Sequence, residues 1–332
     1  MVLMRPDEQI PILPAVGSEP PPEPPAPPPP PEEPAVRHPS PRQTLSYLRG
    51  LLQSHGLEPK SKLGQNFLID LNLLDLTCRT AELGPEDAVL EVGTGTGSLT
   101  TLMADKAGCV FSVEVDKDIQ RIARYFVGDR PNVHLFFGDA LARKNELRAE
   151  MLAGWTELAA RHGCTRRKLV ANLPYVIATP IISNLLISDI PVDRMVVMVQ
   201  WEIGERMQAR PGTKDYNALS VLVQALADIE IVRKVLPTNF FPKPKVDSAI
   251  IMIRPNAEKR AKVGDVPRLR VFLRDLYVHR RKNLRQALSG WPTGPKSKAD
   301  VDAKLAELGI DGSIRAEALD VEQHLRLCQV FG

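Results

Sequence analysis

Residues 88–97 read AVLEVGTGTG, an apolar run that ends in three glycines separated by single residues. A buried strand followed by a glycine-rich turn opens many βαβ units, and glycine lets a cofactor approach the backbone closely. The spacing is G-x-G-x-G, whereas the dinucleotide fingerprint is G-x-G-x-x-G. Because Glu91 stands directly before the turn, a cofactor with a cationic group fits better than a pyrophosphate. Taken alone, the turn is also compatible with a purely structural role.

Around this turn, short β-rich runs alternate with stretches of helical period. The candidate strands are AVLEVG, CVFSVEV, VHLFFG, KLVANL and MVVMVQ, and the candidate helices are LTTLMADKAG, DIQRIARYFVG and PIISNLLIS. This alternation predicts an α/β fold with a mainly parallel sheet that is buried on both faces. The later runs IEIVRKVLP and SAIIMIRP are predicted to be strands of a hairpin at the sheet edge.

The second and third predicted strands end in acidic residues. The second ends in VEVD (113–116), where an acid can accept hydrogen bonds from both hydroxyls of a ribose. The third ends in GDAL (138–141), where Asp139 can accept a hydrogen bond from the amino group of an adenine. Each acid alone also fits a solvated strand end or a helix N-cap. Together they favour a ligand site, because doubly wound folds bind ligands at the carboxyl ends of parallel strands.

The fourth predicted strand ends in NLPY (172–175) on the same edge of the sheet. Asn172 offers a side-chain acceptor, and Leu173 precedes proline, which pushes it into an extended conformation that can aim its carbonyl outward. Two acceptors that converge on an amine would hold its hydrogens and orient its lone pair. Tyr175 offers a flat face on which a planar base can stack. An Asx-turn with a core tyrosine is the alternative interpretation of these four residues.

Composition and charge narrow the function classes. The chain has 332 residues and a net charge of +3; its first forty residues carry a net charge of −4, which leaves +7 on the remainder. A basic body favours a polyanionic partner, although a generically basic surface explains the charge equally well. Four widely spaced cysteines suggest neither a disulfide framework nor a zinc site, and we expect no bound metal. No apolar run reaches the ~20 residues of a membrane span, and the N-terminus makes a poor signal peptide, so we expect a cytoplasmic protein.

Three regions are predicted along the chain. Residues 1–40, with the tract PPPEPPAPPPPPEEP, are predicted to be a disordered proline-rich arm. A helix in TLSYLRGLLQSHGL, a basic loop KSKLGQNFL and a helix over Leu71–Leu83 precede the alternating region, which extends to residue 255. The remainder, 256–332, has helical period and is predicted to be a small helical domain. A polar helical insert at about 142–167 is predicted to be a solvated surface helix.

The ordered motifs resemble those of one enzyme family, the ribosomal RNA small-subunit adenine N6-dimethyltransferases. The matching segments are KLGQNFLID, LEVGTGTGSLT, VEVD, GDAL, ANLPYVIATP, MVQWEIGERM, PGTKDYNALSVLVQ, FFPKPKVDSAI and HRRKNLRQAL. They cover about residues 45–330 and leave out the proline-rich arm. The resemblance implies a Rossmann-like S-adenosylmethionine-dependent methyltransferase domain followed by a small C-terminal α-helical domain. It also implies that the protein dimethylates adenines in ribosomal RNA of the immature small subunit during ribosome biogenesis.

The resemblance also implies roles for single residues. Those expected at the cofactor are Asn66, Leu68, Gly93, Gly95, Glu114, Asp139 and Asn172. Those expected at the target adenine are Asn172, Leu173, Tyr175 and Phe240, with Tyr175 and Phe240 stacking on opposite faces of a flipped-out base. A core pair at a strand end is the alternative interpretation of Phe240 and Phe241. No strong base is present, so we expect catalysis by alignment and preorganised dipoles.

Basic residues in three segments are predicted to contact RNA phosphates, and the third segment makes 256–332 the predicted RNA-binding domain. The predicted contacts are Lys60, Lys62, Lys243, Lys245, Arg280, Arg281, Lys282 and Arg285. The last four belong to a stretch, 268–285, that is predicted to be one basic helix and contains Asp275 as its only acid. One residue departs from the family pattern, because Trp201 stands where the family usually has lysine. The protein is expected to be a monomer.

Two other classes of function fit the sequence. One is an adenine methyltransferase of the same chemistry that acts on large-subunit ribosomal RNA or on DNA. The other is a non-catalytic RNA-binding assembly or transcription factor that keeps the fold. Intact cofactor motifs and NLPY argue against the second class.

Overall fold

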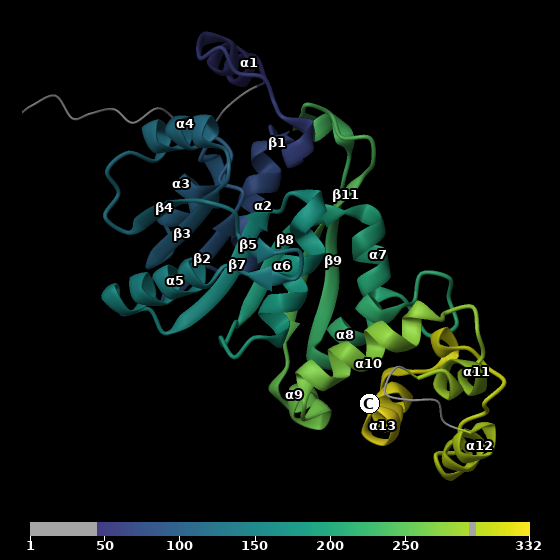
Figure 1. Ribbon diagram of the computed structural model, residues 1–332. Helices are drawn as coiled ribbons and strands as arrows, with labels where there is room; N and C mark the ends of the chain where they lie inside the picture. Colours follow the sequence, from purple (N-terminus) through teal and green to yellow (C-terminus); the bar gives the residue numbers. More distant parts are fainter. Residues whose placement is uncertain (1–44, 292–296) are drawn as a thin grey trace, which may run out of the picture. The chain divides into compact units, whose positions relative to one another are not determined.

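A seven-stranded sheet forms the centre of the fold (Figure 1). Its strand order is β4-β3-β2-β7-β8-β11-β9. The strands are β2 (Asp87–Val92), β3 (Cys109–Glu114), β4 (Val133–Phe137), β7 (Arg166–Asn172), β8 (Arg194–Gln200), β9 (Ala227–Val235) and β11 (Ser248–Pro255). The first five in this order are parallel, and β11 runs antiparallel to both β8 and β9. The predicted α/β sheet and its late antiparallel hairpin are confirmed, with β11 inserted between β8 and the edge strand β9.

The computed structural model describes residues 45–291 and 297–332. The predicted disordered arm over residues 1–40 lies outside the described residues. Within the described ranges, every helix is too short or too polar to cross a bilayer.

Thirteen α-helices surround the sheet or follow it in the described ranges. They are α1 (Leu45–Ser54), α2 (Leu71–Ala81), α3 (Ser98–Ala104), α4 (Lys117–Val127), α5 (Ala149–Arg161), α6 (Tyr175–Ile187), α7 (Trp201–Gln208), α8 (Ala218–Leu226), α9 (Ala257–Val263), α10 (Val266–Val278), α11 (Leu284–Ser289), α12 (Lys298–Glu307) and α13 (Val321–Phe331). Short elements are η1 (Ser61–Leu63), η2 (Pro237–Asn239), η3 (Ala316–Ala318), β1 (Phe67–Leu68) paired with β10 (Phe240–Phe241), and β5 (Leu141–Arg143) paired with β6 (Glu146–Leu147).

Alternation along the central strands explains why helices cover both faces. In β2, Leu90 points into the cluster that contains side chains of α5, α6 and α8, whereas Val89 points into the cluster formed with α2 and α3. Both side chains are fully buried. Successive side chains of a strand point to opposite faces, so a strand covered on both sides is apolar throughout.

The segment after β4 corrects the prediction of a solvated surface helix. Residues 141–147 form the β5–β6 hairpin, and α5 then packs against β2 and β3. Met151 and Trp155 on this helix are fully buried in the core. The many charged residues obscured the narrow apolar stripe of α5, which is the crossover helix between β4 and β7.

The C-terminal helices also differ from the prediction. The stretch 268–285 is two helices, because α10 ends at Val278 and Asn283 caps α11 by accepting a hydrogen bond from the Gln286 amide at 2.9 Å. Apolar residues of α10, α11, α12 and α13 belong to the same buried cluster as the α6 and α8 side chains. The division into a methyltransferase domain and a helical RNA-binding domain stays a prediction.

A buried ion pair fixes α2 to the start of the sheet. The Lys168 ammonium donates to Asp87 Oδ2 at 2.8 Å and to the carbonyls of Ala81 and Glu82 at the end of α2. Asp87 also accepts from Arg166 at 2.9 Å. The Lys168 and Asp87 side chains are 5% and 0% exposed, whereas that of Arg166 is 45% exposed.

Replacing Lys168 by methionine is expected to lower the free energy of unfolding by about 2 kcal/mol, because it removes the donor to the buried Asp87 carboxylate and to the Ala81 and Glu82 carbonyls. Arg166→Met, which removes the exposed partner of the same carboxylate, is expected to cost less than about 1 kcal/mol. Urea denaturation of the two variants measures both values. Equal losses would contradict the dominant role of the buried contact.

Candidate functional site

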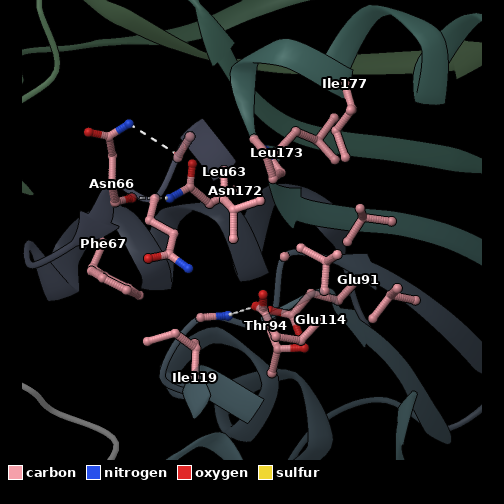
Figure 2. A pocket seen from close by; sticks show the side chains of 18 of the residues that line it. Leu63, Asn66, Phe67, Glu91, Thr94, Glu114, Ile119, Asn172, Leu173 and Ile177 are labelled. Atoms are coloured by element: carbon pink, nitrogen blue, oxygen red, sulfur yellow. Dashed lines mark hydrogen bonds between the residues drawn. The ribbon is translucent and has the colours of Figure 1, made fainter. Parts of the chain in front are cut away.

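A cavity of about 290 Å³ lies at the carboxyl ends of the parallel strands (Figure 2). Its walls come from the ends of β2, β3 and β7, the turn after β4, the first turn of α6 and the segment from Lys62 to Leu68. In Figure 2, Asn66 and Asn172 lie on one side of the cavity, and Glu91, Thr94 and Glu114 lie across from them. Five of the predicted motifs, GQNFL, LEVGTGTG, VEVD, GDAL and NLPY, therefore meet at one site.

The glycine-rich turn after β2 requires its glycines. Gly93 and Gly95 have φ angles of 89° and 55°. Residues that carry a side chain rarely adopt such positive φ angles. A Cβ on Gly93 would lie 3.2 Å from Pro174 of the NLPY motif. The turn thus brings its backbone into direct contact with the end of β7, and both glycines line the cavity.

Glu114 at the end of β3 is fixed by backbone donors. Its Oε2 accepts a hydrogen bond from the Gly95 amide and its Oε1 accepts one from the Asp116 amide, both at 3.0 Å. Burial raises the pKa of this carboxyl, and the amide donors oppose the shift. Each oxygen keeps a further lone pair, so two hydroxyl groups of a ligand can bind the carboxylate together.

Glu91 lies at the centre of a buried hydroxyl network beneath the turn. Its Oε2 accepts from Thr100 Oγ1 and from Ser112 Oγ, both at 2.6 Å, and Ser112 Oγ lies 2.6 Å from Thr94 Oγ1. Burial raises the pKa of Glu91 to about 8, although the two hydroxyl donors oppose the shift. A bound ammonium group would favour the ionised form, in keeping with the cationic ligand that the sequence predicts here.

The raised pKa of Glu91 predicts that the protein loses stability relative to a Glu91→Gln variant as pH rises. Because the folded state holds this proton more tightly than the unfolded state, the penalty on folding grows as pH rises from about 4.5 towards 8. Glu91→Gln removes this pH-dependent penalty, because glutamine does not ionise. Between pH 6 and pH 7.5, the free energy of unfolding of the variant is expected to rise by about 2 kcal/mol relative to wild type. Urea denaturation at both pH values tests this, and a parallel pH dependence of the two proteins would contradict it.

At the end of β7, Asn172 is oriented by a backbone carbonyl. Its Nδ2 donates to the carbonyl oxygen of Asn66 at 3.2 Å, a contact between residues 106 positions apart (Figure 2). A carbonyl accepts but cannot donate, so the amide nitrogen must face it and Oδ1 is turned away. Asn66 and Asn172 both line the cavity.

Tyr175 begins α6 at the cavity, and a serine from a distant strand holds its ring. The Tyr175 hydroxyl lies 2.6 Å from the hydroxyl of Ser248, the first residue of β11. Burial raises the pKa of Tyr175, and the bond to Ser248 opposes the shift. Leu173 is buried, lines the cavity and donates its amide to the carbonyl of Met198 at 3.2 Å.

Three further predicted residues lie at different depths. Asp139 is exposed at the cavity, where its Oδ1 accepts from the Leu141 amide at 2.9 Å, and Leu68 also lines the wall. Phe240 is 2% exposed, pairs with Leu68 and packs in the cluster of α2 and α3, away from the cavity lining. A core position for one member of the Phe240–Phe241 pair was the alternative interpretation, and Phe240 takes it here. Its stacking role stays a prediction that requires the ring to turn outward.

Comparison with known proteins agrees with this geometry. A model of the family described as ribosomal RNA adenine dimethylase matches residues 56–331. The chain belongs to the ribosomal RNA adenine dimethylase family. It is 38% identical over 282 residues to the ribosomal RNA small subunit methyltransferase A of Pediococcus pentosaceus, an alignment that covers 84% of this chain and 92% of that protein. The protein of the same name from Halothermothrix orenii is also 38% identical, over 82% of this chain and 88% of its own.

Two solved structures share the adenine dimethylase fold. A dimethyladenosine transferase from Plasmodium falciparum superposes with a TM-score of 0.63 and 23% identity, over 80% of this chain and 97% of its own. The 23S rRNA methyltransferase ErmE gives a TM-score of 0.55 and 27% identity, over 80% of this chain and 99% of its own. The fold is therefore that of S-adenosylmethionine-dependent methyltransferases. The glycine turn, Glu91 and Glu114 fit that cofactor, since they offer space at the backbone, an acid for an ammonium group and two acceptors for a ribose.

The basic residues predicted to bind RNA divide into two groups in this adenine dimethylase family member. All eight are exposed, and six of them take part in no ion pair within the described residues: Lys62, Lys243, Lys245, Arg280, Arg281 and Lys282. The other two are in ion pairs, Lys60 with Asp116 at 2.9 Å and Arg285 with Asp302 at 2.5 Å. A phosphate would have to compete with a carboxylate for either of these two.

Trp201, the departure from the adenine dimethylase pattern, lies beside a lysine from another strand. The Lys234 ammonium is 4.8 Å from the centroid of the Trp201 ring and 2.8 Å from the Asp247 carboxylate. The Lys234 ammonium is attracted to the face of the Trp201 indole. A positive charge is thus present beside Trp201 even though the usual lysine is missing.

Sequence reasoning missed residues whose partners are far away in the chain. Gln65 and Asp116 contact each other at 2.8 Å, and Ser248 contacts Tyr175. All three occur within the family motifs, GQNFL, VEVD and PKVDS, so motif membership was the available signal. Thr100 and Ser112, the hydroxyl partners of Glu91, lie in buried segments, and nothing else in the sequence indicated that they contact Glu91.

Proposed function

We propose that this protein uses S-adenosylmethionine to dimethylate the N6 amine of adenines in small-subunit ribosomal RNA. The observation that carries the proposal is the position of the NLPY motif, whose Asn172 and Tyr175 line the same cavity as Glu91 and Glu114. The names of the relatives from Pediococcus pentosaceus and Halothermothrix orenii support the small subunit as substrate. We place this activity in ribosome biogenesis in the cytoplasm and treat the enzyme as a monomer.

The cofactor-side residues have separate roles in this proposal. Glu114 binds the ribose hydroxyls, Asp139 binds the adenine amino group, and the Gly93–Gly95 backbone borders the methionine end beside Glu91. Asn66 and Leu68 close the cavity from the N-terminal side. S-adenosylmethionine supplies a methyl group on a sulfonium, which is electrophilic without any metal or base.

The acceptor-side residues align a weak nucleophile. The lone pair of an adenine amine is delocalised into the ring, so the amine must be turned towards the methyl group in line with the departing sulfur. Asn172 Oδ1 and the Leu173 carbonyl accept its two hydrogens, and Tyr175, held by Ser248, supports the flat face of the base. The gain comes from orientation and fixed dipoles. The proton leaves to water after transfer.

The exposed basic residues are proposed to contact the RNA backbone. Lys62 lies at the cavity itself, and Arg280–Lys282 form the turn between α10 and α11. Their contacts would be sequence-independent and would weaken with salt. The base itself reaches the cavity only when it is unstacked from the RNA.

A second candidate is methylation of large-subunit ribosomal RNA. The observation that favours it is the likeness to the 23S rRNA methyltransferase ErmE at 27% identity. The 38% identity to small-subunit methyltransferases favours the first candidate.

A tritiated-methyl transfer assay on three substrates tests the proposal. The purified protein is incubated with undermethylated small ribosomal subunits, large subunits and duplex DNA, and labelled nucleosides are identified after digestion. We expect dimethyladenosine from small subunits only. Label in large subunits or DNA would move the assignment to that substrate, and no label in any of them would reject the enzymatic proposal.

A further inference from the structure

The segment Lys60–Phe67, here called the strap, contacts all three strand ends that form the cavity. Phe67 packs against the glycine turn, where a Cβ on Gly95 would lie 3.4 Å from its ring. Gly64, with a φ of 67°, lies against Pro174 of NLPY. A Cβ added to Gly64 would lie 3.6 Å from the Cβ of Pro174. The strap therefore forms one wall of the cavity and joins the cofactor side to the acceptor side (Figure 2).

The strap is attached to the turn between β3 and α4 through three residues, Lys60, Gln65 and Asp116, here called the latch. Gln65 Nε2 donates to Asp116 Oδ2 at 2.8 Å, and Gln65 Oε1 accepts from the Lys60 amide at 2.7 Å. The Lys60 ammonium lies 2.9 Å from the same Oδ2. The Asp116 side chain is 3% exposed, whereas that of Lys60 is 49% exposed. The bond from Gln65 to the buried carboxylate is therefore the better shielded contact of the latch, and the Lys60 ammonium lies at its solvent side.

The next residue of the strap, Asn66, sets the orientation of Asn172. The carbonyl that accepts from Asn172 Nδ2 belongs to Asn66, the residue directly after Gln65. When Gln65 is held on Asp116, the position of this carbonyl is fixed, and the Asn172 amide can satisfy it only with Nδ2. Oδ1 is then the atom available to a ligand in the cavity.

We propose that Gln65 and Asp116 are positioning residues that hold the Asn66 carbonyl and thereby orient the Asn172 amide for the acceptor amine. This inference rests on the proposed role of Asn172 as the acceptor of that amine's hydrogen bond. Lys60, which the sequence predicts as an RNA contact, serves the latch instead. The latch residues do not touch the target base; they act through the Asn66 carbonyl.

Two kinds of variant test the latch. Gln65→Leu removes both of its hydrogen bonds at similar volume, and Gln65→Glu places a second carboxylate against Asp116. The double variant Gln65→Glu/Asp116→Asn restores the bond with donor and acceptor exchanged, because the amide introduced at position 116 can donate to the carboxylate introduced at position 65. Asparagine at position 116 also still caps α4. Arg121→Gln is the matched control, since Arg121 pairs with the neighbouring Asp118 at 3.5 Å and is 70% exposed.

Single-turnover methyl transfer to undermethylated small subunits measures the effect, with S-adenosylhomocysteine affinity and subunit KM as companion measurements. We expect about a 10-fold lower rate in Gln65→Leu and Gln65→Glu, recovery in the double variant and no change in Arg121→Gln. The KM for subunits is expected to stay constant. Adding Gln65→Leu to Asn172→Ala is expected to cause no further loss of rate, because both changes remove the same orientation.

The outcomes separate the two proposals. If wild type transfers no methyl to subunits, the proposed function fails and the latch inference fails with it. If wild type is active, an unchanged rate in Gln65→Leu overturns the inference alone. Losses that multiply in Gln65→Leu/Asn172→Ala also overturn it, because Gln65 would then act independently of Asn172. Absence of recovery in Gln65→Glu/Asp116→Asn overturns it as well, because the rate would then not depend on the bond between positions 65 and 116.

Discussion

Asn172→Ala is expected to lower kcat for methyl transfer by about 10²–10³-fold, the size seen when one preorganised polar contact to a reacting group is removed. The physical reason is the loss of Oδ1, which the Asn66 carbonyl turns away from itself. Without that acceptor the amine keeps its planar, delocalised geometry. Single-turnover kinetics on undermethylated small subunits measures the loss. The affinity for S-adenosylhomocysteine is expected to change by less than about 10-fold.

Two companion variants define the origin of this loss. Asn172→Asp keeps an acceptor but turns a carboxylate towards the Asn66 carbonyl, so we expect a low rate in this variant as well. Asn72→Ala, which changes an exposed asparagine on α2, is the control and is expected to be fully active. A wild-type rate in Asn172→Ala would exclude Asn172 from the acceptor side of the site.

The sequence predicted most of the sheet because its signals are local. Each central strand is an apolar run between turn residues, and the three-glycine turn after β2 marks where the backbone must adopt positive φ. The late strands β9 and β11 were also predicted as strands. Their order was not, because whether β11 or β9 pairs with β8 depends on packing between segments far apart in the chain.

The errors arose where burial depends on distant partners. The α5 region contains enough arginine and glutamate to suggest a surface helix, yet Trp155 is fully buried against β2 and β3. In the basic stretch 268–285, Arg268 donates to the carbonyls of Gln329 and Gly332, and Arg270 donates to Asn184. The sequence shows that these arginines are charged, but it does not show that they form hydrogen bonds to other parts of the protein.

In the candidate site as well, the features with local signals were predicted and those that depend on distant residues were not. The motifs brought Glu114, Asn172 and Tyr175 to one edge, because strand ends of a parallel sheet share that edge. Three contacts at the site join residues 51 to 106 positions apart: Gln65 with Asp116, Ser248 with Tyr175, and the Asn66 carbonyl with Asn172. Single-sequence patterns carry no information about such pairs.

Glu114→Ala is expected to weaken S-adenosylhomocysteine binding by about 10²-fold or more. Hydrogen bonds to a charged group contribute about 1.5–3 kcal/mol each, and two ribose hydroxyls would lose their shared acceptor. The variant also leaves the Gly95 amide without its partner, which loosens the glycine turn. Isothermal titration calorimetry measures the affinity. Glu86→Ala is the matched control, because Glu86 is exposed at the opposite end of β2, and its affinity is expected to equal that of wild type.

The pH dependence of binding identifies the mechanism of this loss. Burial raises the pKa of Glu114, and hydroxyl donors prefer its ionised form, so wild-type affinity is expected to increase as pH rises through that pKa. Glu114→Ala removes this component, while the component from Glu91, whose pKa is about 8, remains because its ionised form attracts the ligand's ammonium group. An unchanged affinity in Glu114→Ala would show that the ribose binds elsewhere. A weakened affinity with the full wild-type pH profile would instead attribute the loss to the glycine turn, because only a direct contact couples ribose binding to the ionisation of Glu114.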